Sequence, residues 1–177
     1  MKKNDSLKSL IVIVCICLVI AVAMAAINMI TAPKIEEANR KAEQEALKIV
    51  LETATEFEKI EGKYPESVTA LYRDKEQTGY VAMLSAKGYD SSNPIKMAVG
   101  FDNDGKILKC HVISCNGETS GIGTKVGESD FLNTFTGADS SMSQIDTISG
   151  ATISSSAVID AVKDAFTAVQ IAKEAQS

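Results

Sequence analysis

The chain has 177 residues, enough for one domain of ordinary size and an appendage but not for two full domains. Its 18 basic and 23 acidic residues give a net charge of −5, and residues 34–177 alone carry −7. A domain this acidic repels a phosphate backbone, which argues against nucleic-acid binding, and the single histidine excludes a multi-histidine metal site.

An uncharged segment from Ser9 to Pro33 follows a short basic tail. At about 1.5 Å per residue, a helix of this length crosses a hydrocarbon core of about 30 Å, and it exceeds the ~7–15 apolar residues of a cleaved signal peptide. We predict a cytoplasmic tail over residues 1–8 and an uncleaved transmembrane anchor over residues 9–32, with cleavage as the second choice. The lysines of the tail favour a cytoplasmic N-terminus, so the rest of the chain is expected outside the cytoplasm of the cell.

Residues 33–62 carry an amphipathic helical pattern. Apolar residues recur at three- and four-residue steps from Ile35 to Ile60, and Gly62 and Pro65 close the pattern. We predict a helical stalk that continues the membrane helix to residue 62, followed by an extracytoplasmic domain over residues 63–177. An interaction helix for a partner is the alternative.

Three segments of this domain are typical of strands: residues 80–86, 95–101 and 106–113. The last two are joined by an Asp-Asn-Asp-Gly turn whose Gly105 can adopt a positive φ, which indicates a hairpin. The turn lacks the glutamate that an EF-hand needs at its twelfth position, so it is not a calcium loop. The predicted fold class is α+β: one transmembrane helix and a helical stalk, followed by a small mixed α/β domain.

Cys110 and Cys115 fall on or just after the third strand. In an extended chain their Cα atoms would be about 16 Å apart, beyond disulfide reach without a sharp bend. We predict free thiols, and their spacing around His111 does not suit a metal site.

Two polar segments follow the strands. Residues 118–126 form a glycine-spaced loop, which is either an ordinary turn or a place where backbone comes close to a flat or phosphorylated ligand. Residues 146–156 lead into a helix that is expected to end near Lys173. From the residues alone, capping of its N–H groups by hydroxyl side chains is the favoured interpretation, and anion binding by the same groups is the alternative. Gly150 and Ala151 leave room for a bulky group beside Thr152.

The two segments together resemble the membrane-anchored FMN-binding domain family. Asp-Thr-Ile-Ser-Gly-Ala-Thr at residues 146–152 resembles its flavinylation motif, with Thr147 where glycine is common. Glu-Thr-Ser-Gly-Ile-Gly at residues 118–123 resembles its Glu-Thr-Pro-Gly-Leu-Gly loop. The resemblance covers roughly residues 80–170, and within the family it is to the G-type subunits of Rnf complexes, which couple ferredoxin:NAD electron transfer to Na⁺ or H⁺ translocation.

The resemblance implies that a flavin transferase attaches FMN covalently, through its phosphate, to Thr152. It also implies a flavin site formed by Thr152 with Ser149, Gly150, Ala151, Glu118, Thr119, Gly121 and Gly123. The protein would be an electron-transfer subunit among other membrane and peripheral subunits, a redox part of a translocase with no independent active site. The acidic surroundings should disfavour the anionic form of a reduced flavin unless Lys125 or another basic residue compensates.

Three alternatives stay open at this point. The first is the C-type subunit of a sodium-pumping NADH:quinone oxidoreductase, which is usually a longer chain. The second is a membrane-anchored flavin-binding sensor. The third is a pilin-like structural protein, which would be expected to carry a glutamate near the start of its apolar helix and a basic-glycine cleavage site before it; neither is present.

Overall fold

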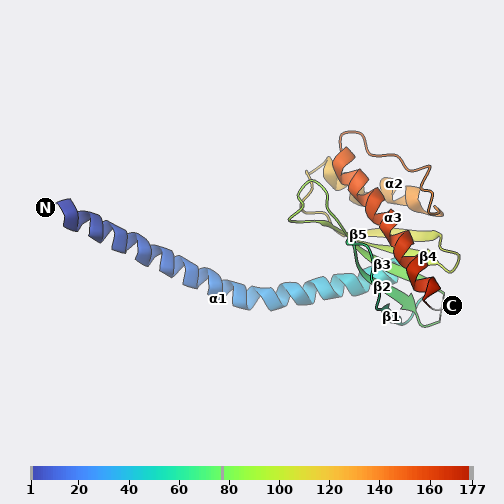
Figure 1. The fold of residues 1–177 in the computed structure, drawn as a ribbon, viewed down its shortest axis with the longest axis horizontal. Helices are drawn as coiled ribbons and strands as arrows, with labels where there is room; N and C mark the ends of the chain where they lie inside the picture. Colours follow the sequence, from blue (N-terminus) through green and yellow to red (C-terminus); the bar gives the residue numbers. More distant parts are fainter. Residues whose placement is uncertain (1, 77, 176–177) are drawn as a thin grey trace. The chain divides into compact units, whose positions relative to one another are not determined.

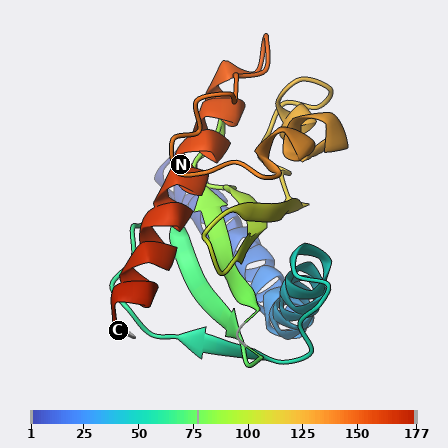
Figure 2. The same ribbon diagram turned by 90° about the vertical axis from the view of Figure 1, so that its right-hand side faces the viewer.

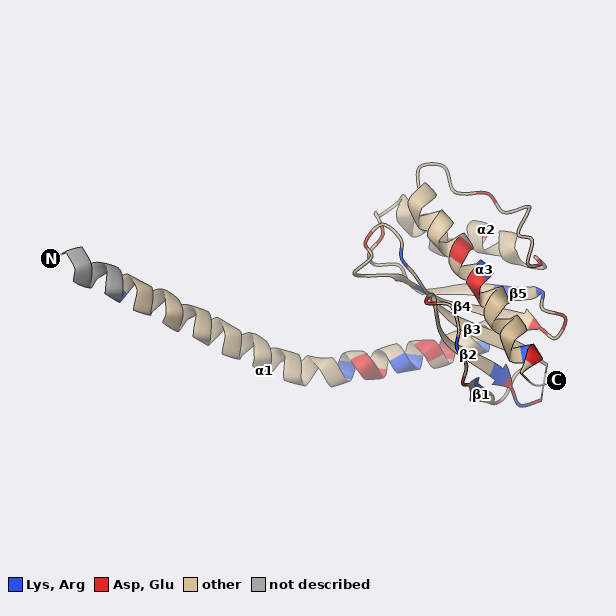
Figure 3. Cartoon of the chain, viewed as in Figure 1, with Lys and Arg blue, Asp and Glu red and all other residues tan. Residues whose placement is uncertain are grey.

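The computed structural model describes residues 2–76 and 78–175, with side chains from residue 8 onward. The chain divides into two compact units, Met1–Lys41 and Ala42–Ser177. Helix α1 (Lys2–Val50) forms the first unit and contributes its last turns to the second (Figure 1). Every described side chain from residue 8 to residue 41 is exposed. The uncharged stretch of α1 is seen in Figure 3, and its most apolar window has a mean hydropathy of 3.4, so α1 is long and apolar enough to cross a membrane.

The predicted extent of the helical stalk is wrong. Helix α1 ends at Val50 instead of residue 62, and strand β1 (Phe57–Ile60) occupies the last part of the interval. The β-branched residues Thr53 and Thr55, which are weak helix formers, lie in the segment between them. Leu51 and Ala54 are buried against the sheet from a turn, so they extend the apolar periodicity without extending the helix.

The second unit is built on a five-stranded antiparallel sheet in the order β1-β2-β3-β4-β5. After β1 come β2 (Val68–Asp74), β3 (Gly79–Ala86), β4 (Ile95–Asp102) and β5 (Ile107–Ser114). The three predicted strands are confirmed as β3, β4 and β5, and the β4–β5 hairpin turns at Gly105, whose φ is +86°. Strands β1 and β2 were not predicted from the sequence. The α+β fold class is confirmed.

Helices cover both faces of the sheet. Helix α3 (Thr152–Glu174) lies across one face (Figure 2), and the short helices η1 (Gly123–Gly127), α2 (Ser129–Leu132) and η2 (Asn133–Phe135) flank it. The last turns of α1 pack on the other face, where a side chain on Gly100 would overlap the Val50 carbonyl. Burial on both faces explains why β3 and β4 are apolar almost throughout.

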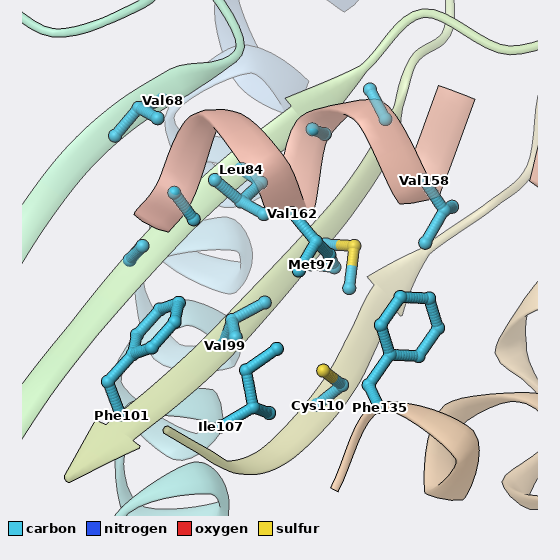
Figure 4. Packing of buried hydrophobic residues seen from close by; sticks show 14 of the residues in the cluster. Val68, Leu84, Met97, Val99, Phe101, Ile107, Cys110, Phe135, Val158 and Val162 are labelled. Atoms are coloured by element: carbon cyan, nitrogen blue, oxygen red, sulfur yellow. The ribbon is translucent and has the colours of Figure 1, made fainter. Parts of the chain in front are cut away.

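The larger core lies between α3 and the sheet. Val158 and Val162 of α3 pack toward Met97 and Ile107 of the sheet (Figure 4). Phe135 of η2 is fully buried in the same cluster. This packing fixes α3 on the sheet and thereby fixes where its first turn lies.

Candidate functional site

A pocket of about 370 Å³ lies at the N-terminus of α3. This volume falls within the roughly 300–1,000 Å³ that small-molecule sites occupy. Three segments that are distant in the sequence supply its walls: the β3–β4 turn, the loop after β5 and the start of α3. The lining residues are Tyr89, Thr119, Ile122, Gly123, Gly150, Ala151, Thr152, Ile153 and Ser154.

The expected capping of α3 by hydroxyl side chains is wrong. Ala151 occupies the N-cap position, and no side chain caps the helix there. The Ser155 hydroxyl instead donates to the Ala151 carbonyl (2.9 Å) and accepts from the Ile148 N–H (3.0 Å), which closes the preceding turn. The N–H groups of the first turn lie at the positive end of the helix dipole, beside the pocket. They therefore have no side-chain acceptor among the described residues.

Thr152 is the first residue of α3, and its side chain is exposed. Gly150, two residues earlier, has a φ of +82° and nothing within 4 Å of where a Cβ would stand. The positive φ is a conformation that glycine adopts at little cost. The turn therefore presents the Thr152 hydroxyl beside open space and beside uncapped backbone donors.

The loop after β5 is held in shape by its own hydrogen bonds. The N–H groups of Ile122 and Thr124 donate to the Thr119 carbonyl (3.1 and 3.2 Å), and the Gly121 N–H donates to Thr124 Oγ1 (2.9 Å). Gly121 has a φ of +72°. The loop is thus a defined wall of the pocket, in which Ile122 stands 48% exposed.

Glu118 lies behind this wall, not in the pocket lining. Its side chain is buried, with an exposed fraction of 6%. Oε1 accepts a hydrogen bond from the Tyr89 N–H (3.0 Å), and Oε2 accepts one from the Ser154 hydroxyl. One carboxylate therefore contacts all three segments that form the pocket.

The structure brings together most of the site residues predicted from the sequence. Thr119, Gly123, Gly150, Ala151 and Thr152 line the pocket. Ser149 and Gly121 neighbour it in the chain, and Glu118 supports it from behind. Lys125 is an exposed residue of η1 and does not line it.

The apolar rim of the pocket, which we define as Tyr89, Ile122 and Ile153, was not predicted from the sequence. Their exposed fractions are 68%, 48% and 61%, the largest of any bulky apolar side chain in the described part of the second unit. All three line the same pocket. Bulky apolar side chains that gather in solvent are typical of a ligand-binding groove or an interaction surface.

The four cysteines are free, and Cys110 and Cys115 both lie outside the pocket lining. Burial raises the pKa of the Cys110 thiol to about 12, so it stays protonated at neutral pH. Burial and, to a lesser extent, the charge of Glu118 raise the pKa of Cys115. Burial and the Lys109 ammonium lower the pKa of His111, which favours its neutral form.

The segment that carries this pocket is similar to a known protein family. Residues 88–167 match the FMN-binding domain family, and this interval contains every residue of the pocket lining. The match confirms the resemblance to the FMN-binding domain family that was inferred from the two motifs.

Two relatives extend the similarity beyond this segment. The chain is 28% identical over 152 residues to the G-type subunit of the proton-translocating ferredoxin:NAD(+) oxidoreductase complex of Clostridium ljungdahlii, a match that covers 80% of each chain. It is 28% identical over 148 residues to the G-type subunit of the ion-translocating oxidoreductase complex of Methanosarcina acetivorans, covering 76% of this chain and 79% of the relative.

Proposed function

We propose that this chain is the flavin-carrying electron-transfer subunit of an Rnf-type membrane complex that couples ferredoxin:NAD oxidoreduction to ion translocation. FMN is attached through its phosphate to Oγ1 of Thr152. The observation that carries the proposal is an exposed threonine hydroxyl at the uncapped N-terminus of α3, in a pocket that lies within an FMN-binding domain. The names of the two relatives support the place in a complex.

The pocket suits both ends of FMN. Backbone N–H groups at a helix N-terminus stabilise a phosphate through hydrogen bonds and through the helix dipole. The apolar rim offers Tyr89, Ile122 and Ile153 to a flat aromatic ring. When bound, FMN supplies reversible electron transfer, while the chain holds it and tunes its surroundings.

Attachment requires one bond to form and one to break. We propose FAD as the donor and a flavin transferase as the enzyme. A bond forms between Thr152 Oγ1 and the phosphorus of the FMN half, the phosphoanhydride bond of FAD breaks, and AMP leaves. The hydroxyl proton passes to water, and no oxidation or reduction takes place.

The other residues of the site have supporting roles in this proposal. Ser149, Gly150 and Ala151 shape the turn that presents Thr152, and Gly150 leaves the space that a bulky group needs. Thr119, Gly121 and Gly123 form the opposite wall with Ile122. Lys125 is an exposed cation on η1, the helix that follows this loop, and its charge would favour a reduced, anionic flavin.

The proposed setting is the cell membrane, with residues 1–8 in the cytoplasm, residues 9–32 as the anchor and the FMN-binding domain outside the cytoplasm. The apolar stretch of α1 supports an anchor, and the basic tail supports its orientation. Protease added to intact cells should degrade residues 63–177. Complete protection of this region, in cells whose other extracytoplasmic proteins are cleaved, would reverse the orientation.

The attachment is tested by the intact mass of the full chain produced with its flavin transferase. The wild-type mass should exceed that of the polypeptide by one FMN phosphoester, and the band should fluoresce in a denaturing gel. Thr152→Ala should lose both signals because the acceptor oxygen is gone. Thr167→Ala, an exposed threonine later in α3, is the matched control and should keep both. Flavin retained on the Thr152→Ala chain would overturn the assignment.

The complex is tested separately by purification of the tagged full chain from the membrane of its source. Co-purification of several multi-span subunits supports an Rnf-type assembly. A flavinylated chain that purifies alone under mild detergent would favour the membrane-anchored sensor.

A further inference from the structure

Glu118 is unusual because its carboxylate is buried at a site proposed to hold an anion. Four polar or charged side chains are buried in the described residues, and three of them, Glu118, Ser154 and Ser155, gather at the N-terminus of α3. The groups that donate hydrogen bonds to the carboxylate are neutral: the Tyr89 N–H and the Ser154 hydroxyl. The ion pairs of the described residues do not include Glu118.

Burying a carboxylate is costly unless its oxygens accept hydrogen bonds, so its retention here needs a structural or chemical reason. The hydrogen bonds supply one reason, since they join residues that lie 29 and 36 positions apart in the chain. The first bond fixes the β3–β4 turn at Tyr89, and the second fixes the first turn of α3 at Ser154.

Two glycines make room for this carboxylate. A Cβ on Gly88 would overlap Glu118 Oε1, and a Cβ on Gly123 would stand 3.0 Å from Oε2 and 2.9 Å from Ser154 Oγ. Neither glycine has a positive φ, so backbone conformation does not require glycine at these positions. Close approach to Glu118 and Ser154 does.

We infer that Glu118 is a positioning residue. Its buried carboxylate holds the Tyr89 turn, the 118–124 loop and the first turn of α3 together, and so keeps Thr152 in the place where the flavin transferase reaches it. This rests on the proposed attachment at Thr152 and differs from the expectation that Glu118 itself approaches the flavin. The required property is the acceptance of hydrogen bonds at a fixed place, not proton transfer or charge.

The test is the initial rate of flavin attachment to the full chain in detergent, with purified transferase and excess FAD, followed by intact mass. Glu118→Ala should slow attachment by about tenfold or more, because small displacements of a reacting group are costly. Glu118→Gln should restore most of the rate, because its amide can accept from the Tyr89 N–H and donate to the Ser154 hydroxyl. Gly88→Ala should reproduce the slow rate by displacing the carboxylate.

The matched control is Asp74→Ala. Asp74 is also a buried carboxylate, and its Oδ2 accepts from the Thr78 hydroxyl (2.6 Å), but it lies at the end of β2 and does not line the pocket. Its loss should reduce thermal stability while leaving the attachment rate near the wild-type value. An equal rate loss in Asp74→Ala would overturn the inference, since general destabilisation would then explain the effect.

Each remaining outcome of the experiment either supports or overturns the positioning role of Glu118. A wild-type rate in Glu118→Ala overturns positioning, and a Glu118→Gln rate as low as that of Glu118→Ala overturns it in favour of a role for the charge. If Glu118→Ala does not fold, Gly88→Ala and Ser154→Ala carry the test: slow attachment at an unchanged melting temperature supports the inference, and a normal rate overturns it. Failure of the proposed function itself is distinct, because Thr152→Ala would then keep its flavin.

Discussion

The two ends of α3 differ in whether the chain itself supplies hydrogen-bond and charge partners for them. At the C-terminus, the Ala175 N–H donates to the Ile171 carbonyl (3.1 Å), and the Lys173 ammonium donates to the Asn103 carbonyl (2.7 Å) and lies 5.9 Å from the centre of the Tyr80 ring. At the N-terminus there is no side-chain cap and no acidic residue in the first turn.

The difference shows where this domain depends on something outside itself. A lysine in the last turn complements the negative end of the helix dipole, so the C-terminal end is satisfied within the chain. The N-terminal end has no side-chain cap and lies beside the apolar rim, and under the proposed function a ligand with both negative charge and an apolar surface occupies it. FMN has both properties.

The largest expected effect concerns the core on which both ends depend. Phe135 is fully buried beside Val158 and Cys110, under the N-terminal half of α3 (Figure 4). Phe135→Ala should lower the free energy of unfolding by about 3–5 kcal/mol, because a buried phenyl ring is lost and a cavity is left. Urea unfolding of the full chain in detergent, followed by circular dichroism, measures the loss.

Leu108→Ala on β5 serves as the control for Phe135→Ala, because Leu108 is 40% exposed and its loss should cost far less. A loss below about 1 kcal/mol for Phe135→Ala would contradict the packing that fixes the first turn of α3.

A smaller effect compares the two ends of α3 directly. In the chain produced without flavin transferase, Thr152→Asp should raise the free energy of unfolding by about 0.3–1 kcal/mol, because it places a negative charge at the uncapped N-terminus. Lys173→Glu should lower it by a similar or larger amount, because it puts a negative charge at the wrong end and removes the bond to Asn103.

Thr167→Asp provides the control, since this position is exposed but lies away from the first turn. Equal effects of aspartate at positions 152 and 167 would contradict the prediction that the N-terminus of α3 stabilises a negative charge. The three variants are compared by urea unfolding at low ionic strength, where charge effects are least screened.

The sequence was sufficient to predict the elements whose patterns are local. The β4–β5 hairpin followed from an Asp-Gly turn between apolar runs, and α3 followed from apolar residues at helical spacing. Strand β2 has a mixed pattern of buried, half-buried and exposed positions, and it acquires its identity from pairing with β3. The error at the end of α1 has the same origin, because Leu51 and Ala54 are buried by the sheet and not by a helical repeat.

In the candidate site, too, the residues within local motifs could be predicted from the sequence, and those placed by distant contacts could not. The two motifs indicated the residues near Thr152 and the 118–123 loop, and the structure brings these segments to one pocket. Ile122 and Ile153 could have been noticed as apolar residues inside polar motifs. Tyr89 could not, because its place depends on a hydrogen bond from its N–H to Glu118, across 29 residues.

The smallest expected effect on stability comes from exposed isoleucines at the two ends of α3, which should differ instead in their effect on the flavin. Ile153 and Ile171 are the exposed isoleucines near the two ends of α3, at 61% and 37% exposure. Substitution of either by glutamine should change the free energy of unfolding by no more than about 0.5 kcal/mol, because little burial is lost.

Ile153→Gln alone should lower the fluorescence anisotropy of the attached flavin, because it removes part of the apolar rim and frees the ring to move. Ile171→Gln should leave the anisotropy at the wild-type value. If Ile153→Gln leaves it there too, the flavin ring does not pack on the rim, and the contrast between the ends is limited to the phosphate.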